Sequence, residues 1–159
     1  MRVLALLIPL LLSACGFELR GAAVLPPRIS KLQVLADQTL RNDVEVLLQG
    51  SDTQLVNNRP QAQVILTMSD LRFDRRVLSV DPNTGHEREF ELSYALDVVA
   101  TDPQGQVLLQ PQTLSQRRDY VFDSAALIGS SQEEAVLRDE MRRELVQQVL
   151  YRLRAATAG

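Results

Sequence analysis

The chain has 159 residues, a formal net charge of −3 at pH 7 and a pI of about 5.2. This length suits one domain with one hydrophobic core, and the acidic balance argues against a nucleic-acid-binding protein. With 1 Cys and 1 His, the chain cannot form an intramolecular disulfide, and a Ser/His/Asp or Cys/His catalytic site would have to use His86.

The N-terminus, residues 1–14, has the order of an export signal. Arg2 supplies a positive charge, residues 3–12 form an apolar run, and small residues precede Cys15. The run is shorter than the roughly 20 apolar residues of a membrane-spanning helix. The residues that end at Cys15 resemble the lipobox of bacterial lipoproteins, which implies cleavage before Cys15. The alternative is an ordinary secreted protein cut near Ala14.

Lipidation of Cys15 would attach an S-diacylglycerol group and an N-acyl chain such as palmitate. Several acyl chains anchor a protein stably, whereas one chain is marginal. Gly16 follows the cysteine, and lipoproteins without aspartate at that position are typical of the outer membrane of Gram-negative bacteria. We therefore expect a cleaved signal peptide over residues 1–14, a lipidated lead over 15–28 and a single α/β domain over 29–155.

The first predicted elements are a strand over 29–35 and a helix that ends near Gly50. Asp37 or Thr39 can cap this helix. A second strand is predicted over 63–76. Its alternation of apolar residues changes parity near Ser69 and Asp70, which predicts a bulge.

A turn at 81–85 leads to the clearest strand, residues 89–98, which alternates apolar and polar side chains. A tight turn at 102–105 precedes a strand over 107–122. Pro111 lies within that strand, so we expect it to be an edge strand or bulged.

The chain ends with a predicted helix that begins at a capping box formed by Ser131 and Glu134. Its outer face is expected to carry Arg138, Arg142 and Arg143. Both helices and the sheet have one apolar face each. The predicted fold is therefore an α+β two-layer sandwich, with two helices on one face of a four-stranded mixed or antiparallel sheet.

Catalytic, metal and cofactor sites are not indicated by the sequence. Glu87, Glu89 and Glu91 lie two residues apart, which places them on the wet face of a strand. No serine lies in a nucleophile elbow, and no glycine-rich phosphate loop is present. A periplasmic hydrolase that uses carboxylates alone is the remaining enzymatic reading, and we expect no enzyme.

Several segments together resemble the LPS-assembly lipoprotein family, LptE, in the same order along the chain. They are Cys15-Gly16-Phe17-Glu18-Leu19-Arg20-Gly21, Tyr94-Ala95-Leu96 with Asp102-Pro103-Gln104-Gly105, Arg117-Arg118-Asp119-Tyr120-Val121-Phe122-Asp123, Glu133-Glu134-Ala135 and Leu137-Arg138-Asp139-Glu140-Met141. The resemblance implies a non-enzymatic outer-membrane lipoprotein that fills and helps to assemble a large β-barrel, LptD. It implies participation in inserting lipopolysaccharide into the outer leaflet, with contact to lipopolysaccharide. A folded domain with a polar exterior suits a polar barrel lumen.

The tight turn at 102–105 sets an expected register in which Arg117 lies near Phe90 and Arg118 near Glu89. Five arginines then converge at one end of the sheet: Arg75, Arg76, Arg88, Arg117 and Arg118. They are candidate contacts for lipopolysaccharide phosphates. The alternative is cross-strand ion pairing, of Arg118 with Glu89 or of Arg88 with Asp119.

Tyr120 and Phe122 are candidate aromatic contacts with the barrel, and core packing is the alternative. The loops at 81–85 and 125–132 lack a basic residue apart from the neighbouring His86, which departs from the family pattern. Other outer-membrane lipoproteins share the anchor and small domain, so a pilotin or an assembly lipoprotein for another barrel or secretion channel remains an alternative.

Overall fold

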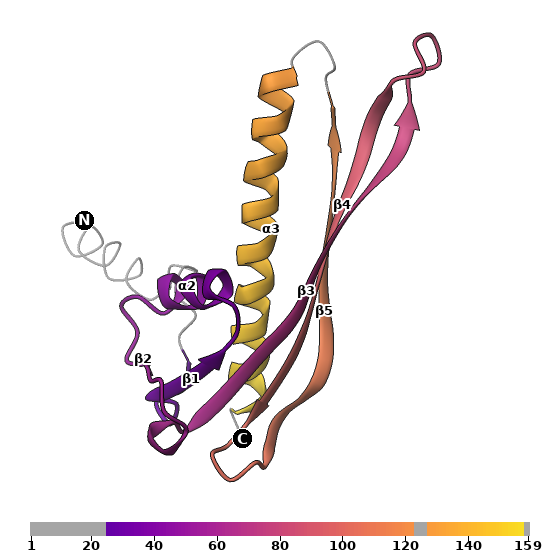
Figure 1. Cartoon of the computed structure of the whole chain (residues 1–159). Coiled ribbons are helices and arrows are strands. Elements are labelled where there is room, and N and C mark those ends of the chain that lie inside the picture. Colours follow the sequence, from indigo (N-terminus) through magenta and orange to yellow (C-terminus); the bar gives the residue numbers. More distant parts are fainter. Residues whose placement is uncertain (1–24, 123–126, 158–159) are drawn as a thin grey trace, which may run out of the picture.

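The computed structural model describes residues 25–122 and 127–157, which form a five-stranded mixed sheet with two α-helices (Figure 1). The strand order is β2-β1-β3-β4-β5. The elements are β1 (Lys31–Leu35), α2 (Gln38–Leu47), β2 (Gln54–Leu55), a 3-10 helix (Arg59–Gln61), β3 (Val64–Val80), β4 (Glu87–Thr101), β5 (Val107–Val121) and α3 (Leu127–Ala156). The predicted α+β class is confirmed. The fifth strand, β2, was missed because two residues carry no alternation pattern.

The sheet combines parallel and antiparallel pairing. β1 is parallel to both β2 and β3, whereas β3, β4 and β5 form an antiparallel meander. Parallel neighbours require a crossover connection, and α2 provides it, because it follows β1 in the chain and precedes both β2 and β3. The three meander strands are much longer than β1 and extend beyond it together with the long helix α3 (Figure 1).

The two helices and one face of the sheet share an aliphatic core. α2 contributes Leu40, Val44 and Leu48 to it, and α3 contributes residues spaced at three and four along its buried face. These α3 residues are fully buried: Leu145, Val146, Val149, Leu150 and Leu153. We call this the proximal core, because it lies at the β1 and α2 end of the molecule. The predicted packing of both helices on one face is therefore confirmed.

The ends of α2 follow from local chemistry. Of the two predicted caps, Asp37 is the one used: its carboxylate accepts a hydrogen bond from the Leu40 amide at 2.9 Å. The helix ends at Leu47, and Gly50 follows with a φ of +79°, a conformation that glycine adopts without strain.

The predicted bulge in β3 is present. The register with β4 shifts between Ser69 and Arg72, and Asp70 has a φ of 52°. The Asp70 carboxylate pairs with Arg72, while the second Arg72 partner is Asp97 across the strand at 3.1 Å. The bulge changes which face the following residues of β3 point to, so that Phe73 and Arg75 lie on the same face as the preceding core residues.

The predicted turn at 81–85 is also present. The Asp81 carboxylate accepts hydrogen bonds from the amides of Asn83 and Thr84, and these bonds hold the pKa of Asp81 below its usual value. Gly85 has a φ of +71°, and Gly105 in the other hairpin turn has a φ of +95°.

The expected register between β4 and β5 is wrong. β5 is an edge strand with two register shifts, one on each side of Ala100, before the pairing becomes regular at Val98 and Gln112. Each shift adds a residue to β5, in the region where Pro111 cannot donate a ladder hydrogen bond. Together with the first pairing, of Thr101 with Val107, which is already one residue beyond the expected register, these shifts place Arg117 opposite Ser93 and Arg118 opposite Leu92, three residues from the expected Phe90 and Glu89.

The capping box predicted for the last helix is wrong. α3 begins at Leu127, so Ser131 and Glu134 lie within the helix. Glu134 faces the sheet, where it meets side chains from β3 and β5. A Ser-x-x-Glu pattern satisfies helix-terminal amides only where the chain starts there, and inside a helix its carboxylate is available for tertiary contacts.

Candidate functional site

The five predicted arginines lie in the same half of the sheet but on different faces. We call this the distal half: β3 after the bulge, β4 before Ala95 and β5 after Leu114. Leu92 in β4 is flanked by Arg75 on β3 and by Arg118 on β5, and both arginines reach α3. Arg76 and Arg117 lie next to them along the strands, where neighbouring side chains alternate between faces. The predicted convergence at one end is therefore present, but it does not form one surface.

Arg75 is held between the sheet and α3. Its Nε lies 3.1 Å from a Glu134 carboxylate oxygen and donates a 3.4 Å hydrogen bond to the Tyr120 hydroxyl. Its guanidinium carbon lies 3.4 Å from the centre of the Phe90 ring. Burial lowers the pKa of Arg75, but the bond to Tyr120 and the charge of Glu134 outweigh it and raise the pKa overall.

Glu134 is the centre of this cluster. Its carboxylate accepts a hydrogen bond from the Tyr120 hydroxyl and pairs with Arg138, one helical turn away, at 2.5 Å. Burial and the bond to Glu134 together raise the pKa of Tyr120. Arg138 also lies over the Phe73 ring at 4.0 Å. Three donors from β3, β5 and α3 thus meet on one carboxylate.

Arg118 is also paired with the helix. Its guanidinium contacts Glu140 at 2.9 Å and Glu144 at 2.8 Å, and Gln116 donates a hydrogen bond to Glu144. The predicted type of interaction, ion pairing, is therefore present, but the partner is not Glu89. The three-residue difference from the expected register places Arg118 opposite Leu92, on the helix-facing side.

The remaining three arginines are more accessible. Arg76 pairs with Glu91 at 3.0 Å and keeps 63% of its side chain exposed. Arg88 and Arg117 are exposed, and neither forms a salt bridge with another residue that the structure describes. Arg88 lines a hollow of about 390 Å³ at the strand ends, together with His86, Val121 and Phe122. Of the candidate phosphate contacts, Arg88 and Arg117 are the exposed ones that an external anion can bind without displacing a carboxylate of the described residues.

The two candidate aromatic contacts pack against Phe90. Tyr120 is 6% exposed and stacks on Phe90 with ring centres 5.6 Å apart. Phe122 is half-buried and meets the same ring edge-on at 5.8 Å. Together with Leu92, Met141 and their neighbours they form the distal cluster, a second core separate from the proximal one. The structure therefore gives these residues the packing role that the sequence also allowed.

Sequence reasoning missed the residues of α3 that hold these contacts. Arg138 and Arg142 were assigned to the outer face, yet Arg138 covers Phe73 and Arg142 binds Asp43 of α2 at 2.6 Å. That bond and the Asp139 contact raise the pKa of Arg142 despite its burial. Only Arg143 is exposed as predicted. The sequence did contain one indication that Glu134 faces the sheet. It lies seven residues before Met141 and eleven before Leu145, which places all three on the same face of the helix.

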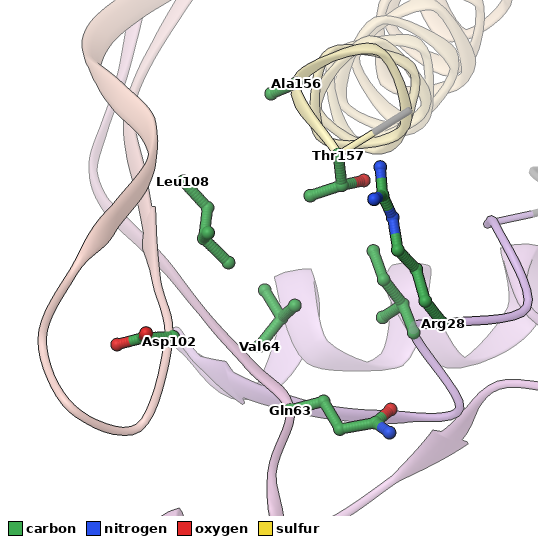
Figure 2. Close-up of a pocket in the computed structure, with 8 residues that line it drawn as sticks. Arg28, Gln63, Val64, Asp102, Leu108, Ala156 and Thr157 are labelled. Carbon is green, nitrogen blue, oxygen red and sulfur yellow. The ribbon is translucent and has the colours of Figure 1, made fainter. Parts of the chain in front are cut away.

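A second hollow lies at the opposite end of the molecule, where the C-terminal end of α3 approaches the start of β3 (Figure 2). It measures about 340 Å³, and Leu108, Val64 and Ala156 line it together with Arg28 and Asp102, which Figure 2 shows on opposite sides of the group. No predicted site residue lies there.

Within residues 25–122 and 127–157, no cluster of three or more His, Cys, Asp or Glu side chains could hold a metal ion. No helix in the same ranges is both long and apolar enough to cross a membrane. Cys15, the predicted lipidation site, lies outside these ranges.

Comparison with known protein families decides the assignment. The model of the family described as "LptE: Lipopolysaccharide-assembly" matches residues 24–153, which is most of the chain and nearly all of the described fold. The chain belongs to the LptE family. A comparison with curated protein sequences gives no match. The resemblance of separate short segments is thus replaced by one continuous match.

Solved structures of lipoproteins share the fold of this LptE family member. The solution structure of uncharacterized lipoprotein B from Nitrosomonas europaea is 25% identical, covers 91% of this chain and 94% of its own, and has a TM-score of 0.74. The structure of rare lipoprotein B from Shewanella oneidensis is 25% identical, covers 80% of this chain and 93% of its own, and has a TM-score of 0.58. A minor lipoprotein from Acinetobacter baumannii, at 24% identity, 80% and 92% coverage and a TM-score of 0.63, supports the fold alone.

Proposed function

We propose that this LptE family member is a lipid-anchored, non-enzymatic outer-membrane protein that fills the lumen of the LptD β-barrel and helps it to assemble. In this proposal the pair inserts lipopolysaccharide into the outer leaflet. The continuous family match over residues 24–153 is the observation that carries the proposal. The signal-like residues 1–14 and Cys15 support the anchor, because they have the order of a lipoprotein export signal.

The surface chemistry of the described fold is compatible with a polar lumen. On the sheet face opposite the helices, the strands carry charged and hydroxyl side chains that bond to one another across the sheet. Arg72 contacts Asp97, whose carboxylate also accepts a hydrogen bond from Thr113, and Arg76 contacts Glu91. Because these polar groups already bond to one another, placing this face against a hydrated polar barrel wall costs little free energy in lost hydrogen bonds to water.

Direct contact with lipopolysaccharide is assigned in this proposal to Arg88 and Arg117. Both are exposed and unpaired among the described residues, and arginine matches phosphate geometry with two parallel donors. Arg76 can join them by leaving Glu91, since an exposed pair of this type contributes only about 0.2–1 kcal/mol. Arg75 and Arg118 are engaged by α3 and are not available in this conformation.

The barrel partnership is tested by isolating the tagged full-length protein from outer membranes in a mild detergent. We expect a large β-barrel protein in stoichiometric amount, with lipopolysaccharide bound. Recovery of the lipoprotein alone, or with a secretion channel, would contradict the partnership and favour a pilotin-like role instead.

The lipopolysaccharide contact is tested separately with the double variant Arg88→Gln/Arg117→Gln. We expect less lipopolysaccharide to co-purify while the barrel is retained. The matched control is Arg152→Gln/Arg154→Gln, which removes the same charge from exposed positions at the other end of α3. An equal loss in both variants would mean that net charge, and not the distal arginines, sets the amount bound.

A further inference from the structure

The distal part of α3, residues 131–140, is attached to the sheet by different chemistry from the rest of the helix. From Met141 onward the helix buries aliphatic side chains completely. Before Met141 its described contacts are mostly polar. Glu134 pairs with Arg75 and accepts a hydrogen bond from Tyr120, Arg138 lies over the Phe73 ring, and Glu140 pairs with Arg118. Leu137 is the apolar contribution of this part, and it is only partly buried. Ionic contacts can exchange for water, whereas buried aliphatic contacts cannot.

We propose that residues 131–140 form a strap that opens from the sheet separately from the rest of α3, and that Glu134 is the latch that keeps it closed. Glu134 is the residue through which both sheet strands hold this part of the helix, because Arg75 comes from β3 and Tyr120 from β5. Its side chain is 15% exposed, so these bonds form in partial shelter from water. The strap also contacts the sheet through Arg138, which lies over the Phe73 ring at 4.0 Å, and through the partly buried Leu137. Its ion pair between Arg118 and Glu140 has a half-exposed carboxylate and is weaker.

Two further features lower the cost of opening. The Nε atom of Arg138 is buried without a hydrogen-bond partner among the described residues, and it gains water when the strap opens. The first turns of the helix contain Gly129, Ser130 and Ser131, which are weaker helix formers than alanine or leucine. Neither feature occurs in the segment from Leu145 to Leu153.

Opening would uncover a surface that the closed state hides. That surface consists of the aromatic rings of Phe90 and Tyr120 with the guanidinium group of Arg75 beside them. Arg118 would lose Glu140 but keep Glu144, which lies outside the strap. The strap therefore controls access to Arg75, one of the five predicted phosphate contacts. This consequence rests on the proposed function, but the opening itself is a property of the fold and is tested without any ligand.

The test is hydrogen–deuterium exchange, read by mass spectrometry, on the full-length protein in detergent. Glu134→Ala removes the latch and keeps a strong helix former, so within the helix it removes only the pair with Arg138, and pairs spaced by four residues contribute little to helix stability. We expect amides of residues 131–140 to exchange at least tenfold faster, while amides of 145–153 keep their wild-type rates. The matched control is Glu133→Ala, which removes an exposed neighbouring carboxylate and is expected to change neither segment.

Equal acceleration of both segments in Glu134→Ala would overturn the proposal, because it would show that α3 unfolds as one unit with the domain. Unchanged exchange in both segments would overturn it as well. If Glu134→Ala does not fold, the wild-type protein is measured in increasing urea below its unfolding transition. If the strap opens locally, it exposes little surface, so the exchange rates of residues 131–140 should rise less steeply with urea than those of residues 145–153. The same urea dependence in both segments would contradict the proposal.

Discussion

The two halves of this molecule use the same sheet and the same long helix but stabilise them differently. The proximal core joins α2, α3 and four strands through aliphatic side chains that exclude water. The distal cluster joins α3 to three strands through aromatic rings, arginines and carboxylates, and its largest fully buried side chain is Phe90. The comparison shows that one helix can be held by aliphatic burial at one end and mainly by polar contacts at the other, and polar contacts are the ones that water can replace.

The proximal half should behave as one cooperative unit, and the largest effect is expected there. Leu40 in α2 is 1% exposed and packs in the same core as the buried face of α3. Leu40→Ala should lower the free energy of unfolding by about 2–5 kcal/mol, because it leaves a cavity between elements far apart in sequence. Urea denaturation measures the loss. A value below about 1 kcal/mol would show that α2 is not integral to the core.

A smaller effect is expected where the proximal half does use charge. The Arg142–Asp43 pair links the two helices, and both side chains are largely buried. Asp43→Asn should lower the free energy of unfolding by about 1–3 kcal/mol, because the largely buried positive charge of Arg142 then loses the negative charge paired with it. Arg143→Gln is the matched control, because Arg143 is exposed and its contact with Asp139 is long at 3.7 Å. Equal losses in urea denaturation would remove the distinction between buried and exposed pairs.

The distal half should lose less stability for a comparable change. Tyr120→Phe keeps the ring on Phe90 and removes only the hydroxyl that bonds Glu134 and Arg75. We expect a loss of about 0.5–1.5 kcal/mol in the free energy of unfolding, typical of one hydrogen bond. Tyr151→Phe, at an exposed hydroxyl on α3, is the control and should change little. A loss as large as that of Leu40→Ala would contradict the reversible character of the distal contacts.

The smallest effect is expected from acid on the open face of the sheet. Hydrogen bonds from Arg72 and Thr113 hold the pKa of Asp97 below its usual value of 3.8. Because the pKa of Asp97 is lower in the folded protein than in the unfolded chain, its ionised form stabilises the fold. This stabilisation is fully present above the unfolded-state pKa of about 3.8, and it is lost as the pH falls from there through the lower pKa of the folded state. Thermal melts of Asp97→Asn should therefore show a weaker decline in Tm in that range than the wild type. An unchanged decline would mean that other carboxylates dominate.

The sequence was sufficient for the elements whose signals are local. The Asp37 cap, the parity change at Asp70 and the turn at Asp81 each depend on a few neighbouring residues, and the structure contains all three. Local signals also predicted that β5 would be an edge strand, because Pro111 cannot serve in a central one. The family assignment came from the order of several weak segments and is confirmed by the continuous match.

The candidate site could be predicted only in part, because its faces depend on register. A single added residue reverses the side to which every later side chain points. The observed register differs from the expected one by three residues, an odd number, because Thr101 pairs with Val107 rather than with residue 106 and β5 then gains one residue at each of two shifts. Arg118 was therefore expected beside Glu89 and instead pairs with Glu140 and Glu144. Glu134 was expected to cap its own helix, since a cap is a local explanation and the donors from β3 and β5 are distant in sequence.

The contrast between the two halves is tested most directly by truncating the same residue type on the same helix. Leu145 is fully buried in the proximal core, and Leu137 is a partly buried member of the distal cluster. In urea denaturation we expect Leu145→Ala to lower the free energy of unfolding by about 2–5 kcal/mol and Leu137→Ala by less than half of the measured Leu145→Ala loss. Equal losses would contradict the division of α3 into a permanently packed end and a reversibly attached end.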